Sequence, residues 1–237
     1  MTSTSMENLD FKSRDELKKY LDAHFVRKLG QGKHGVCTLL DTGVVAKLFH
    51  EEEGVDWVLK FKDFDIPSFQ FAKAVATVDG FAHASFAKPA RGTALNKRVP
   101  LNKDMVLVGK HMQRLSNDIQ LAGDKGICVN DFFEGNIVYD GRKFTVIDTL
   151  PYAYYTFMRY ATKNLTEIIP DVYKLLLDKF ICIGPLLDML YVGDEEAYKN
   201  PAEYLKALRD RVRELTGEEV NTFEEANLAM RRKYYKN

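Results

Sequence analysis

The sequence has few cysteines, and none of them are paired at metal-binding spacing. Its three cysteines, Cys37, Cys128 and Cys182, lie far apart in a chain of 237 residues and form no Cys-x-x-Cys pair. An odd number at such spacing supports neither a structural zinc site nor a disulfide framework. The pattern fits a reducing compartment, and we expect a cytoplasmic protein.

The chain also lacks an excess of charge of either sign. Lys and Arg together number 34, and so do Asp and Glu, which gives a formal net charge of zero. This balance excludes a protein that binds nucleic acid through bulk positive charge. Hydrophobic residues make up 46% and charged residues 29%, a composition typical of a globular protein with a sizeable core.

A long uninterrupted apolar run is missing as well. The most apolar stretch, residues 173–192, contains two lysines, two aspartates and a Gly184-Pro185 break. A membrane span needs about 20 mostly apolar residues, so we interpret this stretch as buried helices and expect no membrane partner. The polar residues 1–10 lack the apolar centre of a secretory signal.

The apolar periodicity and the turn signals predict an α+β protein. Strands are expected in a glycine-containing hairpin over residues 25–40, in a second hairpin around Asp140-Gly141, and at residues 44–49, 86–95 and 105–112. Helices are expected at residues 13–24, 51–62, 68–78, 165–177, 186–192, 201–215 and 223–235. Ser13 and Glu16 have the spacing of a capping box for the first helix. The layout is mainly β before residue 112 and mainly α after it.

Three signals for chemistry follow one another along the chain, and the first is a Gly-x-Gly-x-x-Gly pattern at Gly30, Gly32 and Gly35. Glycines let a backbone approach phosphates closely, although a plain glycine-rich turn has the same composition. In a dinucleotide-binding fold a helix would begin at this motif. Residues 36–40 instead predict an apolar strand, so that fold is rejected.

The second signal is Lys47, which ends the apolar run Val44-Val45-Ala46. A lysine within an apolar strand is costly unless a charged partner compensates it, and the simpler interpretation is an edge residue whose ammonium reaches solvent. Seventeen residues after Gly30, however, Lys47 suits a group that holds nucleotide phosphates under a glycine flap.

The third signal is Asp131, followed by Asn136 and then by Asp148 at the end of an apolar strand. A carboxylate and a carboxamide five residues apart in a loop can divide two tasks. Asp131 would orient an attacking hydroxyl, while Asn136 and Asp148 would bind a metal ion. The alternative makes the first two turn residues and Asp148 a helix cap.

These three signals, in this order, resemble the active-site motifs of the protein kinase-like superfamily. The chain is similar to a small, divergent member of the prokaryotic or viral type, over about residues 25–150. The resemblance implies ATP with Mg²⁺ bound between two lobes, Lys47 and Asp131 as catalytic residues, and Asn136 and Asp148 as metal ligands.

The same resemblance implies a bilobal fold with an N-terminal extension at residues 1–24, a β-rich N-lobe at 25–112 and a reduced helical C-lobe at 113–237. Residues 105–112 resemble the strand that leads to the hinge, which makes Met112 an expected ATP contact together with the three glycines. An acidic partner for Lys47 is not assigned by spacing. The candidates are Glu51, Glu52, Glu53, Asp65, Ser68 and Gln70.

The sequence departs from the family pattern beside both aspartates. Asn130 stands where an arginine normally reads an activation-loop phosphate, and Thr149-Leu150 replaces the usual Phe-Gly. No Ala-Pro-Glu segment follows Pro151. We therefore expect no control by activation-loop phosphorylation.

The resulting hypothesis is an enzyme that transfers the γ-phosphoryl group of ATP to a hydroxyl, with protein Ser or Thr as the first choice of acceptor. A small-molecule kinase of the aminoglycoside or choline type is the alternative that the missing activation segment favours. A pseudokinase that serves as a binding or scaffold module is the alternative that the altered neighbours of Asp131 and Asp148 favour.

Overall fold

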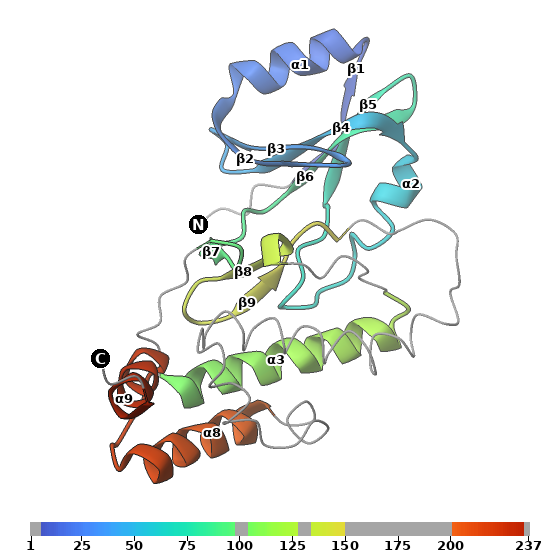
Figure 1. Ribbon diagram of the computed structural model, residues 1–237. Helices are drawn as coiled ribbons and strands as arrows, with labels where there is room; N and C mark the ends of the chain where they lie inside the picture. The colour runs from blue at the N-terminus through green and yellow to red at the C-terminus, as the bar shows by residue number, and fades with distance from the viewer. Residues whose placement is uncertain (1–5, 98–103, 128–133, 150–200, 235–237) are drawn as a thin grey trace. The chain divides into compact units, whose positions relative to one another are not determined.

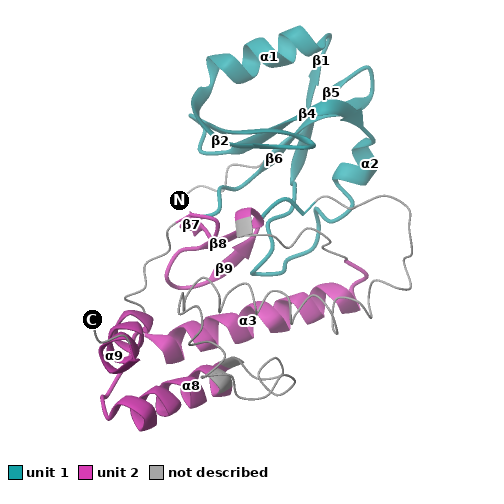
Figure 2. Ribbon diagram, viewed as in Figure 1, with its two compact units in different colours: residues 1–90, 147–153 teal, residues 91–146, 154–237 magenta. Residues whose placement is uncertain are grey.

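The computed structural model describes residues 6–97, 104–127, 134–149 and 201–234. The chain forms two compact units (Figure 2). Unit 1 contains residues 1–90 and 147–153, and unit 2 contains residues 91–146 and 154–237. The structure is thus a mixed α and β protein, as the sequence predicts.

Unit 1 is built on a six-stranded sheet in the order β1-β5-β6-β4-β3-β2 (Figure 1). Its strands are β1 Leu9–Phe11, β2 Phe25–Gly32, β3 Gly35–Leu40, β4 Val45–Glu53, β5 Ala74–Val78 and β6 Phe81–Ala87. β1 runs parallel to β5, and the other pairs are antiparallel. The predicted glycine-containing hairpin and the predicted strand around Lys47 are confirmed as β2–β3 and β4.

Helix α1, Arg14–Ala23, packs on this sheet. Ser13 caps it, because its hydroxyl accepts a hydrogen bond from the Glu16 backbone N–H at 3.2 Å, which confirms the predicted start. Leu17 and Leu21 lie on one face of the helix and are buried against alanines of β4, β5 and β6. Small side chains on the sheet let the helix approach closely and bury its leucines.

Two predicted helices in this unit are wrong. In the expected helix 51–62, β4 continues to Glu53 and only the short α2, Val55–Val58, is helical. The expected helix 68–78 contains β5 instead. All five residues of β5 are buried between β1 and β6, so sheet pairing on both sides overrides the local helical pattern.

The predicted strand 86–95 is divided into the end of β6 and the two-residue β7, Thr93–Ala94. Pro89 interrupts it, because proline has no N–H to donate to a ladder. Gly92, with φ of 110°, turns the chain where a side chain would meet the Tyr139 carbonyl.

Unit 2 contains a three-stranded sheet in the order β7-β8-β9, with β8 at Ile137–Tyr139 and β9 at Phe144–Val146. Asp140 closes the turn between the last two strands, because its carboxylate accepts hydrogen bonds from two backbone N–H groups at 2.8 Å. The predicted Asp140-Gly141 hairpin is confirmed.

Helix α3, Met105–Asp124, replaces the strand predicted at residues 105–112, and that prediction is wrong. Asp104 caps the helix through a 2.7 Å bond from the Leu107 N–H. Buried residues recur every three or four positions from Met105 to Ala122, which is a helical period. The first eight residues alone are too few to show this period. The expected domain boundary at 112/113 lies inside α3.

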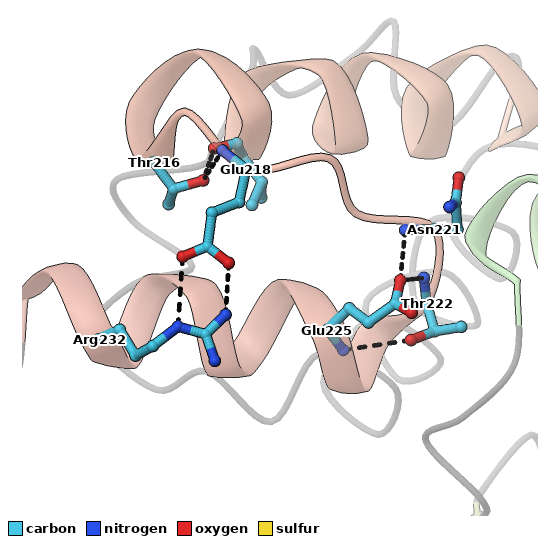
Figure 3. A network of polar contacts seen from close by, with 7 residues as sticks. Thr216, Glu218, Asn221, Thr222, Glu225 and Arg232 are labelled. Atoms are coloured by element: carbon cyan, nitrogen blue, oxygen red, sulfur yellow. Dashed lines mark hydrogen bonds and ion pairs between the residues drawn. The ribbon is translucent and has the colours of Figure 1, made fainter.

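The end of unit 2 is helical, with α8 at Pro201–Thr216 and α9 at Phe223–Tyr234. Both confirm the sequence prediction, and α8 packs on α3 and α9. Thr222 accepts a hydrogen bond from the Glu225 N–H, and Glu225 in turn accepts bonds from the N–H groups of Thr222 and Asn221 (Figure 3). The helices expected at 165–177 and 186–192 lie outside the described residues. No helix in the described ranges is long and apolar enough to cross a membrane.

Candidate functional site

The glycine motif forms the tip of the β2–β3 hairpin. Gly32 pairs with Gly35, and Lys33 and His34 make the turn between them. All of β2 is exposed, because it is an edge strand of the sheet. The tip is thus a largely exposed loop attached to β3, which pairs with β4 on its other side.

The three glycines have different structural roles. A side chain at Gly35 would place a Cβ atom 2.3 Å from the Leu48 carbonyl oxygen, so glycine is needed there for the close approach of β3 to β4. Nothing lies within 4 Å of the Cβ positions built at Gly30 and Gly32, and neither has a positive φ. The fold therefore does not require glycine at positions 30 and 32, and a ligand that approaches the backbone closely would account for both.

Lys47 lies in β4, one strand further into the sheet than the hairpin. It pairs across the sheet with Cys37 on β3 and Ser85 on β6, and only 8% of it is exposed. Its ammonium group forms an ion pair with the Asp148 carboxylate. The structure thus brings together two residues that the sequence assigns to phosphate and metal binding.

The backbone holds Asp148 in an unusual conformation. Its φ is 60°, and Asp79 is the one other described non-glycine residue with a positive φ. The next residue, Thr149, is anchored because its hydroxyl donates a 2.7 Å hydrogen bond to the Gln70 carbonyl. Such conformations persist where surrounding contacts enforce them, and they cluster at functional sites.

Lys47 finds its acidic partner in Asp148 and not in a helix between β4 and β5. Within the described residues, Asp148 is the carboxylate that lies within ion-pair distance of the Lys47 ammonium. The only helix between the two strands, α2, has four residues. The candidates at residues 51–53, and also Asp65, Ser68 and Gln70, therefore do not supply the partner.

Cys37 belongs to this site, and sequence analysis did not single it out. Burial raises the pKa of its thiol, the Lys47 charge opposes that rise, and the Asp148 charge adds to it. The group therefore stays a neutral thiol at physiological pH. Its position follows from the hairpin register, since Cys37 and Lys47 face each other across neighbouring strands.

The remaining predicted residues belong to unit 2. Asn136 ends the short 3₁₀ helix η1, Glu134–Asn136, directly before β8, and is 6% exposed. Met112 is buried in the middle of α3, so the predicted strand end at this residue is wrong, while its contact with ATP stays a prediction. Asp131 lies outside the described residues.

The donor groups suit a magnesium ion. Mg²⁺ prefers oxygen ligands and is commonly held by one or two carboxylates together with substrate phosphates. Asp148 offers a carboxylate that is 29% exposed. No cluster of three or more His, Cys, Asp or Glu residues suited to a metal occurs in the described ranges.

No family model matches the chain, and no curated protein is detectably similar to it. The function is therefore inferred from the residues of the site.

Proposed function

We propose that this protein is an ATP-dependent phosphotransferase that moves the γ-phosphoryl group to a hydroxyl, with Ser or Thr of a protein as acceptor. The observation that carries the proposal is the Lys47–Asp148 ion pair. The two residues are 101 positions apart in the sequence, and the resemblance assigns both to the nucleotide site. Their contact in unit 1, beside the strands of the glycine hairpin, supports a shared role.

The chemistry of these groups fits the proposal. The exposed N–H groups of the hairpin tip would cover the phosphates, and the Lys47 ammonium would stabilise their negative charge. Asp148 would hold Mg²⁺, which would neutralise the charge that develops on the transferred group; that Asn136 is a second ligand rests on the resemblance alone. Asp131 would orient the acceptor hydroxyl.

One observation favours a second candidate, a nucleotide-free binding module of the pseudokinase type. Lys47 and Asp148 neutralise each other directly, and α2 is too short to present a separate acidic partner to Lys47. In this candidate the ion pair is a permanent structural contact. The two candidates differ in whether ATP with Mg²⁺ separates the pair.

Transfer of label tests the proposal. The protein is incubated with γ-labelled ATP and Mg²⁺, alone, with a mixed protein extract, and with a set of aminoglycoside and choline-like alcohols. We expect label on extract proteins, at Ser or Thr. Label on a small molecule would keep the enzyme class and change the acceptor, while binding without any transfer would favour the pseudokinase.

The two aspartates give a sharper test. Asp131→Asn is expected to leave ATP affinity nearly intact and to lower turnover by about 10²- to 10⁴-fold, the usual cost of losing general-base assistance. Asp148→Asn is expected to weaken binding of ATP with Mg²⁺ as well as turnover. Full turnover in the Asp131→Asn variant would contradict the catalytic assignment of Asp131 and leave it as a turn residue.

A further inference from the structure

The glycine hairpin is held at its tip by His50, a residue of β4 that the proposed function does not use. The His50 imidazole Nε2 lies 3.2 Å from the Gly32 carbonyl oxygen. Because a carbonyl oxygen only accepts, Nε2 must carry the hydrogen and donate it. The His50 backbone N–H also donates to the His34 carbonyl at 3.2 Å. One residue therefore binds both sides of the turn.

His50 is itself fixed by the N-terminal helix. The Arg14 guanidinium, in the first turn of α1, donates through Nη2 to the His50 carbonyl at 3.0 Å and also to the Phe49 carbonyl. The β4–β6 ladder is irregular after Leu48, so these carbonyls lie where regular pairing with β6 stops. Arg14 supplies hydrogen-bond donors to both carbonyls.

A restraint at the tip matters because the hairpin has little else to order it. β2 is an exposed edge strand, and its pairing with β3 is irregular at two places, between Phe25 and Arg27 and between Lys28 and Gly30. Glycines lose more conformational freedom than other residues when they are ordered. A loop that is ordered before its ligand arrives binds more tightly, because that entropy is not lost on binding.

We infer that His50 is the positioning residue of the glycine hairpin and that α1, through Arg14, is a working part of the nucleotide site. The inference rests on the proposed function and adds a chain of contacts to it, from Arg14 to His50 to Gly32. Residues 1–24, expected from sequence to be a mere extension, thereby gain a role in nucleotide binding. His50 touches neither phosphate nor acceptor in this account, and it acts through the Gly32 carbonyl.

The experiment compares four chains: wild type, His50→Ala, His50→Gln and the control His24→Ala. His24 is another histidine of unit 1, half-buried where His50 is exposed, and it pairs with Asp41 at the opposite end of the same hairpin. The dissociation constant for ATP with Mg²⁺ is measured by calorimetry. Amide hydrogen exchange at residues 32–35 is measured without nucleotide, because it reports order in the hairpin whether or not ATP binds.

We expect His50→Ala to weaken ATP binding by about two- to tenfold, the usual effect of one hydrogen bond, and to speed amide exchange at the tip. His50→Gln should restore both values, since its amide can donate from a similar position. His24→Ala should bind as wild type does. Arg14→Ala should act in the same direction as His50→Ala.

The possible failures are distinguishable. If wild type binds ATP with Mg²⁺ and His50→Ala binds it equally well with unchanged exchange, the inference is overturned and the proposed function stands. If wild type does not bind ATP with Mg²⁺, the proposed function is overturned, and the inference is overturned with it because no nucleotide site remains for His50 to order. Equal losses in His50→Ala and His24→Ala would also overturn the inference, because a general loosening of the hairpin would then explain both.

Discussion

Two ion pairs in this molecule have opposite characters. Lys47–Asp148 in unit 1 joins residues 101 positions apart, with side chains that are 10% and 29% exposed. Arg232–Glu218 in unit 2 joins residues 14 positions apart, with side chains that are 60% and 42% exposed (Figure 3). The first is a part-buried, long-range contact, and the second is a local contact at the surface.

The difference in exposure bears on how much each ion pair contributes to stability. Removing two charges from water is costly, and a buried ion pair often stabilises a fold no better than apolar residues of the same size. Stability alone is therefore a weak reason for Lys47 and Asp148. An exposed pair contributes little in either direction. We propose that the Lys47–Asp148 pair serves the nucleotide site, whereas the surface pair belongs to the local arrangement around α9.

The largest expected effect comes from breaking the buried pair. Lys47→Met is expected to lower phosphoryl transfer by about 10²- to 10³-fold, the usual loss when one preorganised charge-stabilising donor is removed. Steady-state turnover and calorimetric ATP binding measure it. Arg209→Met, which removes another paired and partly exposed cation of the protein, serves as the matched control and should retain turnover.

The next effect separates the two kinds of glycine in unit 1. Gly35→Ala is expected to lower the free energy of unfolding by about 1–3 kcal/mol, as overpacking does, because the new methyl group would meet the Leu48 carbonyl. Gly32→Ala has open space around it and should keep its stability while it binds ATP more weakly. Urea unfolding measures the stability and calorimetry measures ATP binding. A Gly32→Ala variant that is destabilised but binds ATP normally, together with a stable Gly35→Ala variant, would contradict the proposed roles of the two glycines.

A smaller effect is expected at the α9 cap in unit 2. Thr222→Ala removes the acceptor of the Glu225 N–H and should lower the free energy of unfolding by about 1 kcal/mol. Thr222→Ser keeps the hydroxyl and should restore it. Turnover should stay at the wild-type value in both, since this cap belongs to neither the hairpin nor the Lys47 pair.

The same cap gives a pH dependence. Hydrogen bonds from the backbone N–H groups of Asn221 and Thr222 hold the pKa of Glu225 below its ordinary value of 4.5. Its stabilising contribution is therefore present above pH 4.5 and is lost as the pH falls through the lower, folded-state pKa. Glu225→Gln should show a weaker fall in stability over this range, measured by urea unfolding at successive pH values.

The smallest effect is expected at the surface pair. Arg232→Met should leave the free energy of unfolding within experimental error of wild type, because many exposed pairs contribute nothing measurable. A large destabilisation would mean that exposure does not separate the two pairs as proposed.

Local signals predicted the parts of the fold that local contacts determine. Ser13 begins a helix where its spacing indicates, α9 begins at the predicted residue Phe223, and the glycine and Asp140-Gly141 hairpins turn at their expected residues. The wrong predictions occur where pairing with strands distant in the sequence determines the secondary structure, or where the helical period of buried residues shows only over a longer segment. β5 is a strand because β1 and β6 flank it, and α3 reveals its helical period only beyond Met112.

The candidate site likewise contains residues that the sequence indicates and contacts that it does not. Residue type and order predicted Lys47 and Asp148, because a lysine within an apolar strand and an aspartate after one are visible in the sequence. Their contact, the place of Cys37 and the Arg14–His50–Gly32 chain depend on strand register. Register follows from the pairing of whole strands, so no short segment carries that information.

One measurement tests the central claim that Lys47 and Asp148 form a nucleotide site. The free energy of unfolding is measured for wild type and for the double variant Lys47→Met/Asp148→Asn, each with and without ATP and Mg²⁺ at a hundredfold excess over the wild-type dissociation constant. The account predicts a gain of about 2.7 kcal/mol for wild type and none for the double variant. A wild type that gains nothing, or a double variant that gains as much as wild type, would contradict it.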